Sequence, residues 1–192
     1  MDPAFAIPLW LKLAYAAGVP VIVVVYWRTW GPKNFLWFSD IALFCTAGAV
    51  LTGNSLLASM PAVGVLPLEI AWTLDFLTRG RLGGLSAYMF DVRHPLYLRA
   101  LSLFHLAIPP TLVYLLYGLG YDSRALWAQT LLIWLVLPLT YAAKPVENIN
   151  WVFGLFGKPQ TTLPPLVYLG LEMIVWPLIV VLPMHLILVR VF

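Results

Sequence analysis

Residues 163–189 read LPPLVYLGLEMIVWPLIVVLPMHLILV, and Glu172 is the one formally charged residue among them. A helix needs about 20 apolar residues to cross the hydrocarbon core of a bilayer. A small soluble domain keeps a large fraction of its surface in contact with water, so it could not hide such a stretch. The stretch therefore predicts a transmembrane helix.

The rest of the chain has the same character. Hydrophobic residues make up 62% of it and charged residues 10%, and the mean hydropathy is +0.90. Soluble domains are about 25% charged. We predict an all-α polytopic membrane protein, a bundle of about six transmembrane helices that forms a single domain over residues 1–192. The six predicted spans are Ile7–Trp27, Phe35–Leu51, Leu56–Leu77, Leu98–Tyr117, Ala125–Ala143 and Leu163–Val189.

Three features between and within the spans bear on the fold. The connection Thr52–Ser55 is short, which predicts a tight antiparallel hairpin of the second and third helices. The connection Arg79–Tyr97 mixes polar and aromatic residues, and we expect it to lie in the membrane interface. Prolines inside the spans predict kinks, because each removes one helix hydrogen bond; they are Pro61, Pro67, Pro109, Pro110, Pro138, Pro177 and Pro183.

The distribution of basic residues predicts the orientation. Connections one, three and five carry most of them: Arg28, Lys33, Arg79, Arg81, Arg93, Arg99, Lys144 and Lys158, against Lys12, Arg124 and Arg190 on the other side. The positive-inside rule then places these connections in the cytoplasm and both termini outside, in a multi-pass protein of the cell inner membrane. Because topology accounts for the net charge of +3, no nucleic-acid partner is expected.

Polar side chains inside the spans gather at one depth. An ionisable group within a membrane is costly and usually faces the bundle interior or a wet cavity. Counting residues from the helix ends at about 1.5 Å each places most of these groups in the cytoplasmic half of the membrane, with His185 near the opposite end. That group comprises Ser39, Asp40, Glu69, Asp75, His105 and Glu172.

These residue types suggest acyl chemistry. Ser39 could serve as a nucleophile with His105 as its base, and Glu172 or Asp40 could orient the imidazole, as in a catalytic triad. The amide of Asn148 or Asn150 could donate to an oxyanion. We also assign Asn148, Asn150, Glu69 and Trp37 to the predicted substrate site.

Structural interpretations compete with this one. A serine in a membrane helix commonly packs or bonds its own helix, and a buried histidine can bond a neighbouring helix. Asp40 and Asp75 could pair with arginines at the interface. Cys45 fits a core position or an alternative nucleophile. No metal or other cofactor is expected, because His94, His105 and His185 lie at three depths without ligand spacing.

The chain shows two resemblances to known families. Residues 93–97, Arg-His-Pro-Leu-Tyr, look like the RHPxY segment of isoprenylcysteine-type membrane methyltransferases, where it helps to bind S-adenosylmethionine. In that family a helix hairpin and a tail rich in Glu and Arg follow, whereas here the tail is an apolar span.

A second resemblance covers most of the chain, with the bacterial six-helix YwaF-like integral membrane family. That family is distantly similar to a eukaryotic transmembrane ether-phospholipid acyltransferase and to androgen-induced fatty-ester hydrolases. Ser39 stands where the acyltransferase has its Cys nucleophile, and Asp40 and His105 match an Asp and a His of the pattern. The run Asn150, Lys158-Pro159 and Leu171-Glu172 resembles the segment before the last helix.

The departures from this pattern are Trp37-Phe38 in place of Leu-His and Ser in place of Cys, which imply a weaker enzyme or none. The chain is also similar to proteobacterial proteins described only as membrane-associated, which implies no chemistry.

We therefore hypothesise a membrane-embedded lipid acyl hydrolase or acyltransferase whose partner is a membrane lipid. The alternative is a non-catalytic accessory subunit of a larger energy-transducing or photosynthetic membrane complex, or a binder of a quinone, carotenoid or chlorophyll. Aromatic residues, 15% of the chain, suit that role equally well. A transporter is the third choice, because polar groups confined to one half of the membrane leave no continuous path.

Overall fold

Every regular element in the computed structural model, which describes residues 5–144 and 147–192, is a helix. The elements, in chain order, are α1 Leu9–Trp30, η1 Pro32–Leu36, α2 Phe38–Thr52, α3 Ser55–Gly64, α4 Leu66–Leu77, η2 Ala87–Phe90, α5 Leu96–Leu101, α6 Phe104–Leu119, α7 Ala125–Ala143, η3 Ile149–Trp151, η4 Leu155–Gly157, α8 Pro165–Trp176, η5 Pro177–Val181 and α9 Leu182–Val191.

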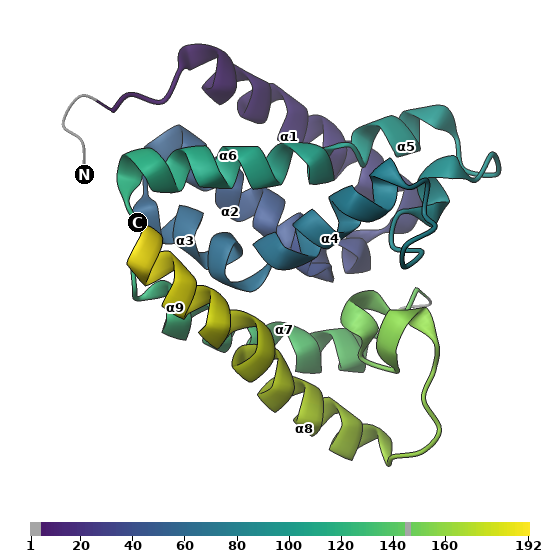
Figure 1. The fold of residues 1–192 in the computed structure, drawn as a ribbon. Coiled ribbons are helices and arrows are strands. Elements are labelled where there is room, and N and C mark those ends of the chain that lie inside the picture. The colour runs from purple at the N-terminus through teal and green to yellow at the C-terminus, as the bar shows by residue number, and fades with distance from the viewer. Residues whose placement is uncertain (1–4, 145–146) are drawn as a thin grey trace.

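The predicted spans are recovered in outline. Four helical segments are long and apolar enough to cross a membrane: α1, Leu96–Leu119, α7 and Pro165–Val191. The bent pair α3–α4 makes a fifth, and α2 is a shorter apolar helix. The structure thus confirms an all-helical protein with about six candidate spans. In Figure 1, α1 begins and α9 ends on the left, while the connections 78–95 and 147–164 lie on the right.

The α2–α3 hairpin is formed as predicted. Gly53 ends α2 in the left-handed conformation, with φ of 71°, and its N–H donates to Ala49 O. Asn54 then begins α3 by accepting a hydrogen bond from Leu57 N through its side chain. A left-handed glycine followed by an Asn cap is a typical way to end one helix and begin the next.

Helix α3 lies at the centre of the bundle. It packs against α2, α6, α7 and α9, and Ala58, Ser59 and Ala62 on it are fully buried. Small residues let helices approach closely in a membrane. Helices α3 and α7 approach so closely at Gly64 that a Cβ atom there would lie 2.5 Å from the side chain of Gln129 on α7.

The predicted span Leu56–Leu77 is broken after Gly64. Helices α3 and α4 meet at Val65 with a bend of 59°. Pro67 lies in the first turn of α4, where its missing N–H costs no helix hydrogen bond. The break gives α4 its own direction and places Glu69 in the first turn of the new helix. A second proline, Pro177, coincides with the π-helical turn η5 between α8 and α9.

The connection after α4 is tied to Asp75. The carboxylate of this buried residue accepts hydrogen bonds from the backbone N–H groups of Leu82, Gly83 and Gly84 through Oδ1. Its Oδ2 accepts from both the backbone N–H and the hydroxyl of Ser86. The predicted ion pair of Asp75 with a nearby arginine does not form, because neighbouring backbone groups satisfy the carboxylate.

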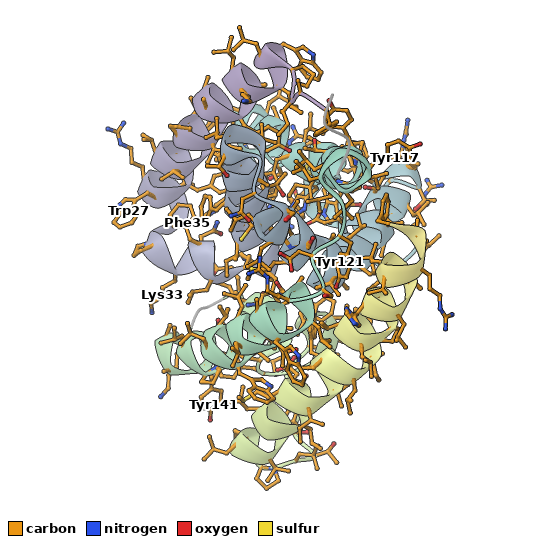
Figure 2. All side chains as sticks on the ribbon, turned by 90° about the vertical axis from the view of Figure 1, so that its left-hand side faces the viewer. Trp27, Lys33, Phe35, Tyr117, Tyr121 and Tyr141 are labelled. Atoms are coloured by element: carbon orange, nitrogen blue, oxygen red, sulfur yellow. The ribbon has the colours of Figure 1, made fainter. Side chains whose placement is uncertain are left out.

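The outer surface of the bundle is apolar and aromatic, as contact with lipid requires. Trp27, on the outer side of α1 (Figure 2), pairs with the partly buried Phe35 of η1, with ring centroids 6.2 Å apart. Trp10, Trp27 and Trp127 each expose more than half of their surface. Together with the apolar helices, this surface supports a membrane location.

Candidate functional site

A cavity of about 510 Å³ lies at the end of the bundle where the connections after α1, α4 and α7 gather. Its walls come from the end of α1, the starts of α2 and α4, the segment 83–105, the loop 147–157 and Trp176 on α8. This volume falls in the usual range of small-molecule sites, which are mostly apolar with a few converging polar groups.

A carboxylate–imidazole pair forms the polar centre of this cavity. Nδ1 of His105, at the start of α6, lies 2.7 Å from Oε2 of Glu69 on α4. Glu69 is 2% exposed. Because an ionised carboxylate only accepts hydrogen bonds, we assign the proton to Nδ1. The Nε2 atom of the neutral ring is then free to accept a proton, as a general base must.

Two aromatic rings hold the imidazole of His105 in place. Trp72, one helical turn beyond Glu69 on α4, stacks on it with centroids 4.5 Å apart. The ring of the preceding residue, Phe104, stacks at 4.2 Å. A catalytic side chain whose rotamer is fixed by packing and by a second hydrogen bond is better oriented for reaction.

Ser39 and Asp40 line the same cavity from the first turn of α2. Asp40 is 2% exposed, and its Oδ2 accepts a hydrogen bond of 3.0 Å from the side chain of Asn34. Asp40 therefore has an amide partner and not the predicted arginine. Within the described residues no hydrogen bond joins Ser39 to His105. The structure brings the two residues to the lining of one cavity.

Asn150 connects the loop 147–157 to the beginning of α2. Its Oδ1 accepts from Phe38 N at 3.0 Å, and its Nδ2 donates to Leu36 O at 2.7 Å. An N–H of the first helical turn, which has no partner inside the helix, is thereby satisfied from 112 residues away. Asn150 lines the cavity, and its amide bonds the last residue of η1 and the first residue of α2. These two bonds tie the loop 147–157 to the residues next to Ser39. The amide of Asn150 has a second N–H that they do not use, so its role as an oxyanion donor stays a prediction.

Asn148 has a related role inside the loop. Its Oδ1 accepts from Phe153 N and its Nδ2 donates to Gly154 O. It does not line the cavity. The loop holds Asn148, Asn150, Trp151 and Phe156 at positive φ. Strained backbone of this kind persists where surrounding structure enforces it, and it is common near functional sites.

We predict that Asn150→Ala lowers the free energy of unfolding by about 2–3 kcal/mol, because it removes one buried and one partly buried hydrogen bond and places Ala at a φ that Asn tolerates better. Asn54→Ala, at the exposed cap of α3, is the matched control and should cost about 1 kcal/mol. Thermal unfolding of both variants in detergent measures the difference. Equal melting temperatures would show that Asn150 is an ordinary cap.

The other predicted site residues divide between the cavity and other places. Trp37 lines the cavity at the start of α2. Glu172 is buried on α8 but does not line it, and neither of its carboxylate oxygens has a hydrogen-bond partner within the described residues. Glu69, which we had placed only in the substrate site, holds the position at His105 that we predicted for Glu172 or Asp40. Cys45 lies on α2 away from the lining residues.

Sequence reasoning missed several lining residues. Tyr26 on α1 and Ser102 share a hydrogen bond of 2.9 Å between their hydroxyl oxygens, and Trp72, Tyr88 and Arg99 also line the cavity. Helical spacing could have revealed some of them. Trp72 lies three residues after Glu69, and Ser102 lies three residues before His105, so each shares a face with a residue already singled out.

The methyltransferase-like segment contributes only in part. His94 lines the cavity, but Arg93 is exposed and pairs with Asp91 through bonds of 2.6–3.0 Å. The Arg93 guanidinium lowers the pKa of Asp91 to about 2. Because Arg93 pairs with its neighbour outside the cavity, the segment gives little support to a cofactor site of the kind that the resemblance implies.

Comparison of the chain with models of known families, with curated proteins and with solved structures gives no match. Fold and site therefore define the class: an all-helical membrane protein with an aromatic cavity that contains a buried carboxylate–histidine pair. No group of three or more His, Cys, Asp or Glu side chains in the described ranges is arranged to hold a metal ion.

Proposed function

We propose that this protein is a membrane-embedded acyl hydrolase or acyltransferase that acts on a lipid ester, with Ser39 as nucleophile, His105 as base and Glu69 as the group that orients His105. The observation that carries the proposal is the buried Glu69–His105 bond of 2.7 Å in the cavity that Ser39 also lines. In a catalytic triad, a carboxylate bound to Nδ1 sets the tautomer and leaves Nε2 to act on the nucleophile.

The reaction proceeds in two balanced steps. Ser39 Oγ attacks the ester carbonyl while His105 Nε2 takes the hydroxyl proton and then passes it to the departing alcohol, which leaves an acyl-serine. Water, or the hydroxyl of a second lipid, then attacks the acyl-serine as His105 takes its proton. That proton returns to Ser39 Oγ as the acid or the new ester departs. Glu69 stabilises the imidazolium that forms in each step.

The location of the cavity suits such a substrate. Its lining residues belong to the ends of spans and to the connections between them, so a lipid can present its ester region there while its chains remain among the helices. The walls are mainly aromatic and apolar, and the polar side chains converge around Glu69 and His105. Apolar surroundings of this kind strengthen the electrostatic effect of the pair.

The first experiment is fluorophosphonate labelling of the detergent-purified protein. We expect Ser39→Ala to abolish labelling and His105→Asn to slow it about 10²–10⁴-fold, the usual contribution of a general base. Ser123→Ala is the matched control, because Ser123 is exposed in the connection 120–124 at the other end of the bundle and should label as wild type does. Labelling that persists in Ser39→Ala would contradict the assignment of the nucleophile.

A second function, as a subunit of a larger complex or a binder of a hydrophobic cofactor, is favoured by the exposed aromatic surface. Trp10 is 68% exposed and Trp127 is 69% exposed. Such rings also occur where a membrane protein faces lipid alone. Mild solubilisation from the native membrane separates the two: a stoichiometric partner or an extractable pigment or quinone would favour this second function.

A further inference from the structure

The carboxylate of Asp40 has unused acceptor capacity inside the cavity. Asp40 is 2% exposed, yet its Oδ1 has no hydrogen-bond partner within the described residues, while Oδ2 accepts from Asn34. A buried polar group without a partner is costly, and a native structure seldom leaves one unsatisfied. Because Asp40 lines the cavity, a cation there can supply an electrostatic partner for its carboxylate.

Aromatic rings surround the same space from several elements. Tyr26 and Trp30 pair on α1 with centroids 4.5 Å apart. Trp72 and Tyr88 pair at 6.4 Å, and Trp151 and Trp176 pair at 6.1 Å. All six line the cavity. The faces of aromatic rings carry negative electrostatic potential and attract cations that lie within about 6 Å.

The charges of the lining also favour a cation. Asp40, Glu69 and Glu147 are acidic, and Arg99 is the one permanently positive side chain among the described lining residues. Arg99 donates to the backbone oxygen of Met89 and forms no ion pair with these acids in the described structure. Arg99 is therefore not a direct counter-ion of the Asp40 carboxylate.

We propose that the cavity binds the trimethylammonium group of a zwitterionic phospholipid, with Asp40 and Trp30 beside the cation. A trimethylammonium has no N–H to donate, so aromatic faces and a nearby carboxylate recognise it better than hydrogen bonds could. Arg99, in the same cavity, suits the phosphate of that head group. This assignment deepens the proposed function, because the role of the bound lipid as a substrate rests on that function. Binding of the head group can be measured without any reaction.

Titration of intrinsic tryptophan fluorescence tests the proposal on protein purified in a maltoside detergent. The probes are dihexanoyl lipids with phosphocholine, phosphoethanolamine or phosphoglycerol head groups, and choline chloride. We expect the phosphocholine lipid to bind about 10-fold more tightly than the other two lipids. Phosphoglycerol carries no cation to place against the rings, and the primary ammonium of phosphoethanolamine is strongly hydrated and loses more on entering an aromatic site. Asp40→Asn and Trp30→Leu should each weaken its binding by about 10-fold or more.

Two matched variants serve as controls. Asp122→Asn changes a carboxylate at the other end of the bundle that pairs with Arg124, and Trp127→Leu changes a lipid-facing tryptophan of α7. Both should bind the phosphocholine lipid as wild type does. Unchanged melting temperatures of the Asp40 and Trp30 variants would confirm that any loss of binding is local.

The outcomes separate the possible ligands. Equal binding of the phosphocholine and phosphoglycerol lipids, or tighter binding of the phosphoethanolamine lipid, would overturn the proposal. Choline that binds as tightly as the lipid would overturn the lipid part of it. The Ser39→Ala variant should still select phosphocholine. If it does and no ester is cleaved by the wild type, acyl transfer fails and head-group recognition stands. Ester cleavage without head-group preference would mean that head-group recognition fails and acyl transfer stands.

Discussion

Glu69→Gln should slow the reaction of Ser39 with a fluorophosphonate by about 10³-fold, with the protein still folded. The amide keeps the size of the side chain but can donate a hydrogen bond, so it favours the histidine tautomer with the proton on Nε2. That tautomer cannot accept the serine proton, and the equivalent change in a serine protease triad lowers turnover about 10⁴-fold. The rate of label incorporation, followed by gel fluorescence over time, measures the effect.

The controls for this prediction separate orientation from folding. Glu69→Asp keeps the carboxylate and should recover part of the rate. Glu172→Gln changes a buried carboxylate that does not line the cavity, and it should label at close to the wild-type rate. If Glu172→Gln slows labelling and Glu69→Gln does not, the orienting role belongs to Glu172, one of the two residues, with Asp40, that the sequence alone had suggested.

Asp75→Ala should lower the free energy of unfolding by about 3–5 kcal/mol. The substitution leaves five donors of the segment 82–86 without their acceptor, and each hydrogen bond to a charged group is worth about 1.5–3 kcal/mol before new contacts with water are counted. Because Gly83 and Gly84 line the cavity, loss of this anchor should also disturb the site. Thermal unfolding in detergent measures stability, and limited proteolysis between residues 78 and 86 measures local opening.

Asp91→Ala is the matched control for Asp75→Ala. Asp91 lies in the same connection and pairs with the exposed Arg93, and an exposed ion pair contributes about 0–1 kcal/mol. We expect its melting temperature to stay close to that of the wild type. An Asp75→Ala protein as stable as Asp91→Ala would show that the segment after α4 holds its conformation without the carboxylate.

Hydropathy was sufficient to find the helices because a bilayer imposes one requirement, a long apolar run, on every span. It located α7 at Ala125–Ala143, as the structure has it. It did not reveal the break between α3 and α4, because Pro67 is compatible with either a kinked helix or a new helix start. The direction of α4 after that break is what brings Glu69 to His105.

The site was predicted less completely than the fold. Depth counting placed Ser39, Asp40, Glu69 and His105 in one half of the membrane, and all four line the same cavity. Depth says nothing about which way a side chain faces around its helix, so Glu172 was grouped with them although it lies outside the lining. The role of Asn150 depends on a contact with α2 across 112 residues, which no local pattern indicates. The orientation in the membrane stays a prediction.

The central claim is that Ser39 is the serine activated by the Glu69–His105 pair. Mass spectrometry of the fluorophosphonate-treated protein, digested after labelling, locates the modified residue directly. We predict a single phosphonylated site at Ser39, absent from protein unfolded before labelling. An adduct on Ser102 instead, or no adduct on folded protein, would contradict the account.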